Sequence, residues 1–434
     1  MTVLNLISLL GLIVLAGLAW AVGGFRRPIA WRTLTGSGGL MLLMGIAVFL
    51  LPQTRILLLI VNDLVVALLS ASRVGAGFLL GPLMLNPGET TAAGEPSVGF
   101  ILAAQVLPAV IFFASLMAVG YHLGLIQPII RLFGRLFRTT LQLSGAEALA
   151  GSANIFVGIE SATTVGPYLA GMTRSELLTL LTCAMSTVAS TTLALYVFFL
   201  QEPFPQIAGH LISASLLSIP AAALVSKLIL PETGQPETLG SLPPLVESRR
   251  HGNTMAALSA GSWDGLKLAA GIATLLVAVL GLVGVLDLVL SQATAPLEGW
   301  FGAPLTLQRI LGWVFTPLAW LLGLEAGDLS QAGQLLGQRI LLTEVVAYQK
   351  LGEMAAAESL SPRTMLVLSY ALCGFAHLAS VGIFVGGITA LVPSRRDDLA
   401  ALAFPALAGS TLATLMTGAL AGLFYHGQQG ILGL

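Results

Sequence analysis

The sequence is dominated by apolar runs that are long enough to cross a lipid bilayer. Residues 3–22 contain no charged side chain, and comparable runs recur almost to the C-terminus. A helix of about 20 apolar residues spans the hydrocarbon core of a membrane. Only 9% of the residues are charged, whereas a soluble domain carries about 25%. We therefore predict an all-α polytopic protein embedded in the lipid bilayer, with roughly eight to twelve crossings or hairpins.

Charge and cysteine usage exclude several classes of function. The formal net charge is −1, which gives no electrostatic basis for binding nucleic acid. Cys183 and Cys373 both lie in apolar segments, and the sequence has no Cys/His spacing typical of a metal site. It also lacks a Walker-type phosphate loop, so we do not expect ATP-driven transport. The first apolar run has no basic leader or small-residue cleavage motif, and we interpret it as a retained span.

One stretch, residues 151–170, interrupts the apolar pattern with polar side chains and helix breakers. Asn154 and Glu160 lie there among glycines, hydroxyl residues and Pro167. A carboxylate at membrane depth is costly unless it faces a cavity or a partner. Broken helix at that depth is tolerated only where the backbone is buried in protein or lines a wet cavity. We predict a re-entrant hairpin beside a solute site.

Arginine clusters orient the predicted spans. The clusters lie at 26–32, 131–138, 249–250 and 395–396. A single topology places all four on the cytoplasmic side, where loops carry an excess of arginine and lysine. In this topology, we interpret residues 54–80 as an interfacial amphipathic helix followed by a loop.

The two halves of the chain share an order of elements. Each half has a polar hairpin, a span interrupted by small and hydroxyl residues, and an uninterrupted span. The first set occupies 143–230 and the second 305–434, and they enter from opposite faces. An N-terminal scaffold (1–142) precedes them, and a cytoplasmic linker with a scaffold span (231–304) separates them. Inverted repeats of this kind are the common plan of secondary transporters, whose site lies at the repeat interface.

The second repeat is predicted from two apolar pieces and a broken span. Both pieces, 305–323 and 338–352, are short for a crossing. We interpret them as the arms of a hairpin joined around Glu325. The following span, 363–392, is predicted to break near 373–380.

Six short motifs carry a resemblance to a known family. They lie at 152–158, 167–169, 172–177, 344–348, 370–376 and 393–398, and they read SANIFVG, PYL, MTRSEL, EVVAY, YALCGFA and PSRRDD. Taken together and in order, they resemble the concentrative nucleoside transporter family in its bacterial form. The resemblance runs from residue 112 to the C-terminus.

The resemblance implies an architecture and a function. It implies a homotrimer in the bacterial inner membrane, with eight spans, two re-entrant hairpins and an interfacial helix in each protomer. Each protomer moves one nucleoside together with sodium or a proton by an elevator-like motion. No cofactor other than a bound sodium ion is implied, and no enzymatic activity.

The resemblance also assigns a substrate site, with two departures from the family pattern. The positions that match the family's substrate residues are Gly158, Ile159, Glu160, Val188, Glu344, Phe375, His377 and Ser380. A glutamine–threonine pair that reads the nucleobase in the family is replaced by Ile159 and a gap. The asparagine that binds ribose in the family is replaced by His377. These changes leave open a modified nucleoside, or another small polar solute, as the substrate.

A cation site follows from the same comparison. The family's sodium ligands match the Asn154 side chain and the Thr187 hydroxyl, with carbonyls near Val157 and Val188. The structural alternative is that Asn154 simply caps a broken helix. Sodium and proton coupling therefore both stay open.

Several roles remain open for the buried polar groups. Glu160 and Glu344 are suited to accepting bonds from vicinal hydroxyls, and Arg339 is a candidate partner for Glu344. His377 is either a packed core residue, a substrate contact or the carrier of the coupling proton. A receptor without transport activity, or an intramembrane enzyme using His377 and Ser380, are the competing classes.

Overall fold

The computed structural model describes residues 2–85, 89–90, 94, 96–244, 251–297 and 302–427, and for Ile159 and Glu160 it describes the backbone only. Within these ranges the chain is helical, with a single isolated β-bridge between Thr90 and Pro96. Eight helices in the described part are long and apolar enough to cross a membrane. The all-α, polytopic prediction is confirmed.

The N-terminal part contains two predicted spans and one helix that differs from the prediction. Its elements are α1 (Val3–Val22), α2 (Trp31–Leu50), α3 (Pro52–Leu80) and η1 (Gly81–Met84). The predicted interfacial helix and loop at 54–80 are instead one uninterrupted helix, whose hydropathy is sufficient for a span. The polar Asn62 does not mark an interface, because it is 4% exposed and its side chain bonds to Pro205 O and Gly209 N.

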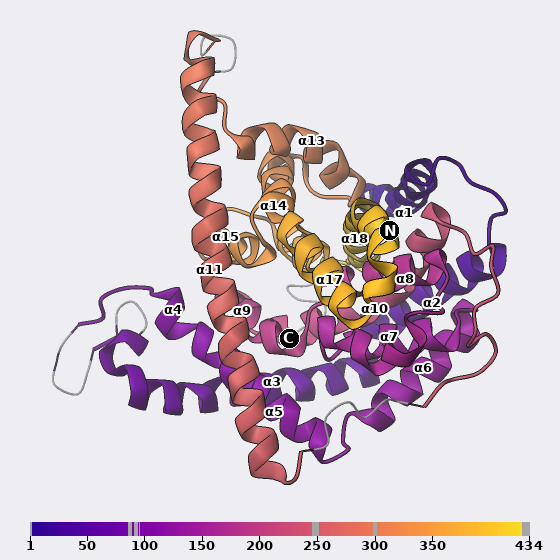
Figure 1. The fold of residues 1–434 in the computed structure, drawn as a ribbon. Helices are drawn as coiled ribbons and strands as arrows, with labels where there is room; N and C mark the ends of the chain where they lie inside the picture. Colours follow the sequence, from indigo (N-terminus) through magenta and orange to yellow (C-terminus); the bar gives the residue numbers. More distant parts are fainter. Residues whose placement is uncertain are drawn as a thin grey trace.

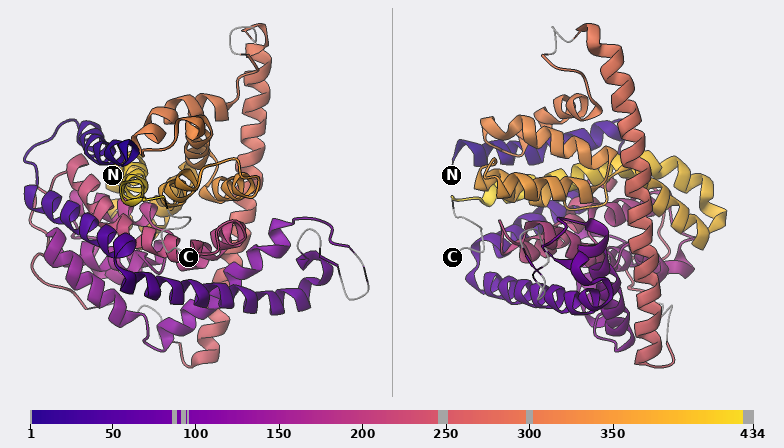
Figure 2. Two further views of the ribbon diagram at one scale, coloured as in Figure 1. Left: turned by 180° about the vertical axis from the view of Figure 1, so that it is seen from behind. Right: turned by 90° about the vertical axis from the view of Figure 1, so that its left-hand side faces the viewer.

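A helix pair forms one side of the molecule. It consists of α5 (Leu107–His122), preceded by the short α4 (Leu102–Gln105), and α11 (Thr254–Thr294), followed by η3 (Ala295–Leu297). Figures 1 and 2 show α11 running from the top to the bottom of the molecule, past the helices of both repeats. Gly261 and Gly265 bring α11 close to α5, where a Cβ on Gly261 would lie 2.8 Å from Ala114 O.

The start of α11 corrects the predicted linker. The helix begins at Thr254 rather than near 266, because the Asn253 side chain accepts a bond from Ala256 N and caps it. Linker residues Glu247, Arg249 and Arg250 lie outside the described residues. The arginine-rich helix is α6 (Gln127–Leu141), which buries Ile130, Gly134, Phe137 and Leu141, exposes Arg131 and Arg135 and leaves Arg138 half-buried.

The elements of the two predicted repeats can be read directly from the helix order. The first repeat consists of α7 (Gly145–Asn154), η2 (Ile159–Tyr168), α8 (Arg174–Ser186), α9 (Ser190–Leu200) and α10 (Ile207–Ile229). The second consists of η4 (Ala326–Asp328), α14 (Leu329–Leu341), α15 (Glu344–Ala356), α16 (Pro362–Ala371), α17 (Leu378–Leu391), η5 (Pro393–Arg395) and α18 (Arg396–Phe424). Each has a broken hairpin, a broken helix and a continuous helix.

The second hairpin turns at a different place from the predicted one. The apolar piece 305–323 forms a separate helix, α13 (Leu307–Leu321), and the hairpin is α14 with α15. Its break lies at Leu342 and Thr343 and not around Glu325. The Thr343 hydroxyl accepts a bond from Val346 N, so it starts a new helix where the apolar run itself continues.

A buried ion pair anchors the first hairpin at its start. Lys227, near the end of α10, lies 2.6 Å from Glu147 and donates to Ser175 at 2.9 Å. Glu147 also accepts a bond from Ser144 N in a capping box that begins α7. Both charged side chains are at most 5% exposed. The charge pair thus joins α7, α8 and α10 at one end of the repeat.

Candidate functional site

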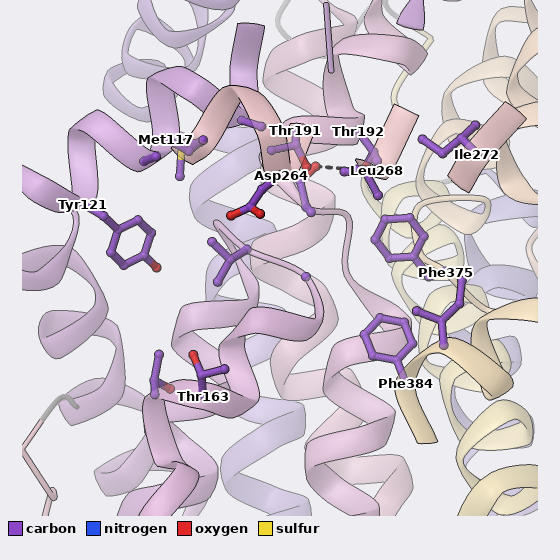
Figure 3. A pocket seen from close by; sticks show the side chains of 18 of the residues that line it. Met117, Tyr121, Thr163, Thr191, Thr192, Asp264, Leu268, Ile272, Phe375 and Phe384 are labelled. Carbon is purple, nitrogen blue, oxygen red and sulfur yellow. Dashed lines mark hydrogen bonds between the residues drawn. The ribbon is translucent and has the colours of Figure 1, made fainter. Parts of the chain in front are cut away.

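A cavity of about 760 Å³ lies between the α5–α11 pair and the broken elements of both repeats. In Figure 3, Met117 and Tyr121 stand on one side, Phe375 and Phe384 stand on the other, and the Asp264 carboxylate lies between them. A volume of this size is ordinary for a small-molecule site. The cavity also reaches Arg131 and His251, which lie by the basic clusters that the topology places in the cytoplasm.

Three helix N-termini border this cavity. The N-cap residues are Ala189 for α9, Thr343 for α15 and His377 for α17, and all three line it. The first turn of a helix carries unpaired N–H groups and partial positive charge, which favour oxygen-rich ligands. The breaks thus supply free backbone N–H groups, whereas the surrounding continuous helices use theirs in internal hydrogen bonds.

Gly374 makes the break in the second repeat possible. Its φ of +152° is rarely adopted by other residues, and a Cβ there would lie 2.9 Å from Ser186 O, the last residue of α8. The breaks of α8–α9 and α16–α17 therefore meet at this glycine. This contact brings the candidate residues of both repeats to one place.

Glu344 is buried and held by side chains from both repeats. It is 3% exposed and is the first residue of α15. The Tyr196 hydroxyl on α9 donates to Oε1 at 2.8 Å, and His377 Nε2 lies 2.9 Å from Oε2. Two predicted site residues, Glu344 and His377, thus contact each other directly, and Tyr196, which sequence analysis did not single out, also bonds to Glu344.

His377 caps α17 through its own side chain. Ser380 N–H donates to Nδ1 at 3.2 Å, and Nε2 on the other side of the ring lies 2.9 Å from Glu344 Oε2. The imidazole therefore connects the start of α17 with the carboxylate on α15.

The remaining candidate residues divide into two groups. Val157, Gly158, Phe375 and Ser380 line the cavity with Glu344 and His377. Asn154, Thr187 and Val188 are at most 1% exposed and lie behind it. The side chains of Ile159 and Glu160 lie outside the described part, although their backbone begins η2.

Arg339 does not pair with Glu344, contrary to one sequence-based expectation. It is fully buried, and its Nη1 donates to Ala371 O at 2.6 Å and to Thr414 Oγ1 at 2.7 Å. Ala371 is the last residue of α16, so the guanidinium caps the C-terminal end of a broken helix. Arg339 therefore points to the break between α16 and α17, and the residues in contact with Glu344 are His377 and Tyr196.

Ser380 is also committed to the helix cap. Its hydroxyl donates to His377 O at 2.6 Å and accepts from His377 N at 3.3 Å. Neither bond directs the hydroxyl at the imidazole Nε2. The arrangement is therefore a capping box and not a nucleophile activated by a base.

A second polar region lies where the first hairpin meets the α8–α9 break. Ser190 N and Oγ both bond to Phe156 O, at 3.2 and 2.5 Å, and so join the two breaks. Asn154 ends α7, and Thr187 follows the last residue of α8. Two helix C-termini thus face this region, and their partial negative charge favours a cation.

The side chains in this second region fit a hard cation. Asn154 Oδ1 accepts from Ser161 Oγ at 2.7 Å, while its buried Nδ2 has no partner among the described residues. Because a hydroxyl also accepts, turning the amide over keeps the Ser161 bond and presents Oδ1 instead. Thr187 Oγ1 donates to Cys183 O and keeps its lone pairs. Where the structure describes side chains, no cluster of His, Cys, Asp and Glu suits a transition metal.

Sequence analysis missed two residues that line the cavity, Asp264 and Tyr121, and also Tyr196, which bonds to Glu344. Asp264 on α11 and Tyr121 on α5 belong to the scaffold pair, far in sequence from the motifs. The available signal for Asp264 was a single carboxylate just before a long apolar run. Tyr196 had no comparable signal, because it is one aromatic residue in an apolar helix.

Two broken hairpins, two broken helices and a shared cavity define a secondary transporter of the inverted-repeat class. The chain belongs to the concentrative nucleoside transporter family. Residues 10–83 and 210–422 match the N-terminal and C-terminal parts of the family described as Na+ dependent nucleoside transporter, and residues 103–202 match a nucleoside recognition domain. It is a transporter and not an enzyme.

Individual relatives span the whole chain. The nucleoside permease NupC of Helicobacter pylori is 33% identical, over 97% of this chain and 98% of that protein. The putative nucleoside permease NupX of Escherichia coli is 31% identical, over 96% and 98%. The solved structure of CNTnw in an inward-facing substrate-bound state has a TM-score of 0.85 at 34% identity, covering 97% of this chain and 98% of that one. The bacterial relatives and the apolar helices identify a multi-pass inner-membrane protein.

Proposed function

We propose that this protein imports nucleosides together with a cation, by alternating access across the inner membrane. The observation that carries the proposal is the buried Glu344, held by Tyr196 and His377 in a cavity where both repeats break. An ionised carboxylate at this depth needs donors, and a solute with adjacent hydroxyls supplies them. Such a site rejects analogues that lack the hydroxyls, because its acceptors are then left unpaired.

Phe375 gives the cavity a flat apolar wall beside this polar centre. Its ring is half-buried, lines the cavity and lies 6.2 Å from the Phe384 ring. Aromatic faces stack on planar ligands such as nucleobases. The pairing of a carboxylate for hydroxyls with a ring for a base fits a nucleoside better than a sugar or an amino acid alone.

We further propose sodium as the coupling ion. Asn154 and Thr187 would supply side-chain oxygens, and Val157 and Val188 would supply carbonyls at the two breaks. The proposal rests on the two helix C-termini that face this region and on the unpartnered Asn154 amide. His377 is the competing route through a proton, and its role in the cap of α17 speaks against it.

We propose that the protein is a homotrimer in which the repeats slide past a fixed scaffold. The supporting observation is α11, which packs on α5 through small residues and exposes an apolar face on the other side, including Val277, Leu282 and Val285. Such a face requires lipid or a neighbouring protomer. The cavity lies between this pair and the repeats, at the surface where an elevator motion would occur.

The function is tested by thermal unfolding of the purified protein with a ligand panel. The panel holds nucleosides, bases, sugars and amino acids in sodium chloride. A true substrate at about 100 times its Kd adds about 2.7 kcal/mol to the free energy of unfolding. We expect stabilisation by nucleosides only. Stabilisation by a sugar or an amino acid, with none by any nucleoside, would contradict the proposal.

The same assay tests sodium coupling. Replacing sodium by choline should weaken the stabilisation by nucleoside, and Thr187→Val should remove the difference between the two salts. Equal shifts in sodium and choline, with a dependence on pH instead, would favour proton coupling.

His377→Asn should raise the affinity for nucleosides about threefold to tenfold, the value of one net hydrogen bond. Asparagine can still cap α17, but its shorter side chain leaves Oε2 of Glu344 open to substrate. His251→Asn, at the far end of the same cavity, is the matched control. Unchanged affinity in His377→Asn, measured by uptake kinetics between pH 6 and 8, would exclude a substrate role for His377.

A further inference from the structure

We infer that Tyr196 is a positioning residue that holds Glu344 in the orientation needed to accept a vicinal diol. The inference rests on the proposed function and names the part of the substrate that this site recognises. The hydroxyl of Tyr196 on α9 donates to Glu344 Oε1 at 2.8 Å. The two residues are 148 positions apart in sequence and belong to different repeats.

The tyrosine is itself rigidly placed. It is fully buried, and its ring stacks on Tyr348 with centroids 4.4 Å apart and planes inclined by 21°. Tyr348 lies on α15, one turn after Glu344, and its hydroxyl donates to Ser369 O on α16 at 2.6 Å. The stack therefore fixes the position of the Tyr196 ring relative to α15, the helix that carries the Glu344 carboxylate.

The carboxylate of Glu344 keeps acceptor positions free on both oxygens. An ionised carboxylate offers about four acceptor positions, two on each oxygen. Tyr196 occupies one position on Oε1, whereas Oε2 accepts no hydrogen bond from the described residues, although His377 Nε2 lies 2.9 Å away. At least one position on each oxygen is therefore left, and Glu344 lines the cavity. Two neighbouring acceptors match two hydroxyl donors on adjacent carbons, as in the 2′,3′-diol of a ribonucleoside.

The Tyr196 bond prevents the carboxylate from turning, because a rotation that moves Oε1 away from the hydroxyl lengthens this bond. His377 Nε2 limits the space on the other side, where it lies 2.9 Å from Oε2. Without Tyr196, Oε1 becomes free to take any orientation or a water molecule. Substrate binding must then also order the Glu344 carboxylate, and the entropy cost of this ordering lowers the affinity.

The test compares Tyr196→Phe with Tyr348→Phe. Both changes remove one hydroxyl from one ring of the stack, but only Tyr196 bonds to Glu344. The probes are uridine and adenosine, each paired with its 2′,3′-dideoxy analogue, with Kd measured on the purified protein. We expect Tyr196→Phe to weaken ribonucleoside binding about tenfold and dideoxynucleoside binding less than about twofold, as for a bond to a charged group.

Three outcomes decide the inference. Equal losses for ribonucleosides and dideoxynucleosides in Tyr196→Phe, or the same change of their ratio in Tyr348→Phe, would overturn it. In a Glu344→Gln background, Tyr196→Phe should cause no further change of that ratio, and an undiminished effect there would also overturn it. If the wild-type protein binds none of the four probes, the proposed function fails, and the substrate class inferred here fails with it.

Discussion

Glu344→Gln is expected to reduce nucleoside uptake at least about 100-fold, which corresponds to about 2.7 kcal/mol of lost binding. The amide keeps the shape of the side chain but loses the charge that strengthens every bond to it. It also replaces one acceptor by a donor, so either Tyr196 or His377 faces an N–H group across 2.8 or 2.9 Å. Initial rates of radiolabelled uridine uptake in membrane vesicles measure the loss.

The matched control for this prediction is Glu353→Gln. Glu353 lies on the same helix, α15, but is exposed and pairs with Lys350 at 3.0 Å. It should retain uptake close to that of the wild type, and both variants should insert into the membrane to the same extent. Uptake by Glu344→Gln within about threefold of the wild type, a difference near 0.7 kcal/mol, would remove Glu344 from the substrate site.

Lys227→Met is expected to destabilise the protein by about 3–5 kcal/mol, the typical cost of leaving one member of a buried ion pair without its partner. Lys227 and Glu147 are 2.6 Å apart, and neither is more than 5% exposed. Methionine fills the space of the lysine stem but leaves the Glu147 charge at the start of the first hairpin. Thermal unfolding in detergent, without ligand, measures the change.

A second substitution distinguishes charge from packing. Adding Glu147→Gln to Lys227→Met removes the uncompensated charge, and we expect it to restore more than half of the lost stability. Lys350→Met, which opens an exposed pair on α15, should leave the unfolding temperature unchanged. A double variant as unstable as Lys227→Met would show that packing and not charge makes the ion pair important.

The sequence by itself determined the class of the protein and the positions of its two central breaks. Apolar runs of bilayer length specify helices because a lipid environment requires every backbone group to bond within its own segment. The breaks at 151–170 and 373–380 were predictable, since glycines and polar residues at membrane depth have few other uses. The Thr173 cap was predictable as well, because a capping box is local in sequence.

Features that depend on neighbours distant in sequence were not predictable in this way. The polar residues of α3 suggested an interface, but Asn62 bonds to the chain around α10, where it is buried. The turn of the second hairpin was placed around Glu325, because hydropathy cannot distinguish a helix restarted by the Thr343 cap from a continuous one.

Only the tertiary structure decided the partners of Glu344. Arg339, five residues earlier, was the natural candidate by sequence, yet it bonds to the end of α16 and to α18. Tyr196 on α9 bonds to Glu344 instead, and His377 at the start of α17 lies 2.9 Å from it. The physical reason is that a hydrogen bond depends on position and direction in space, and the crossing of two broken helices brings these side chains together.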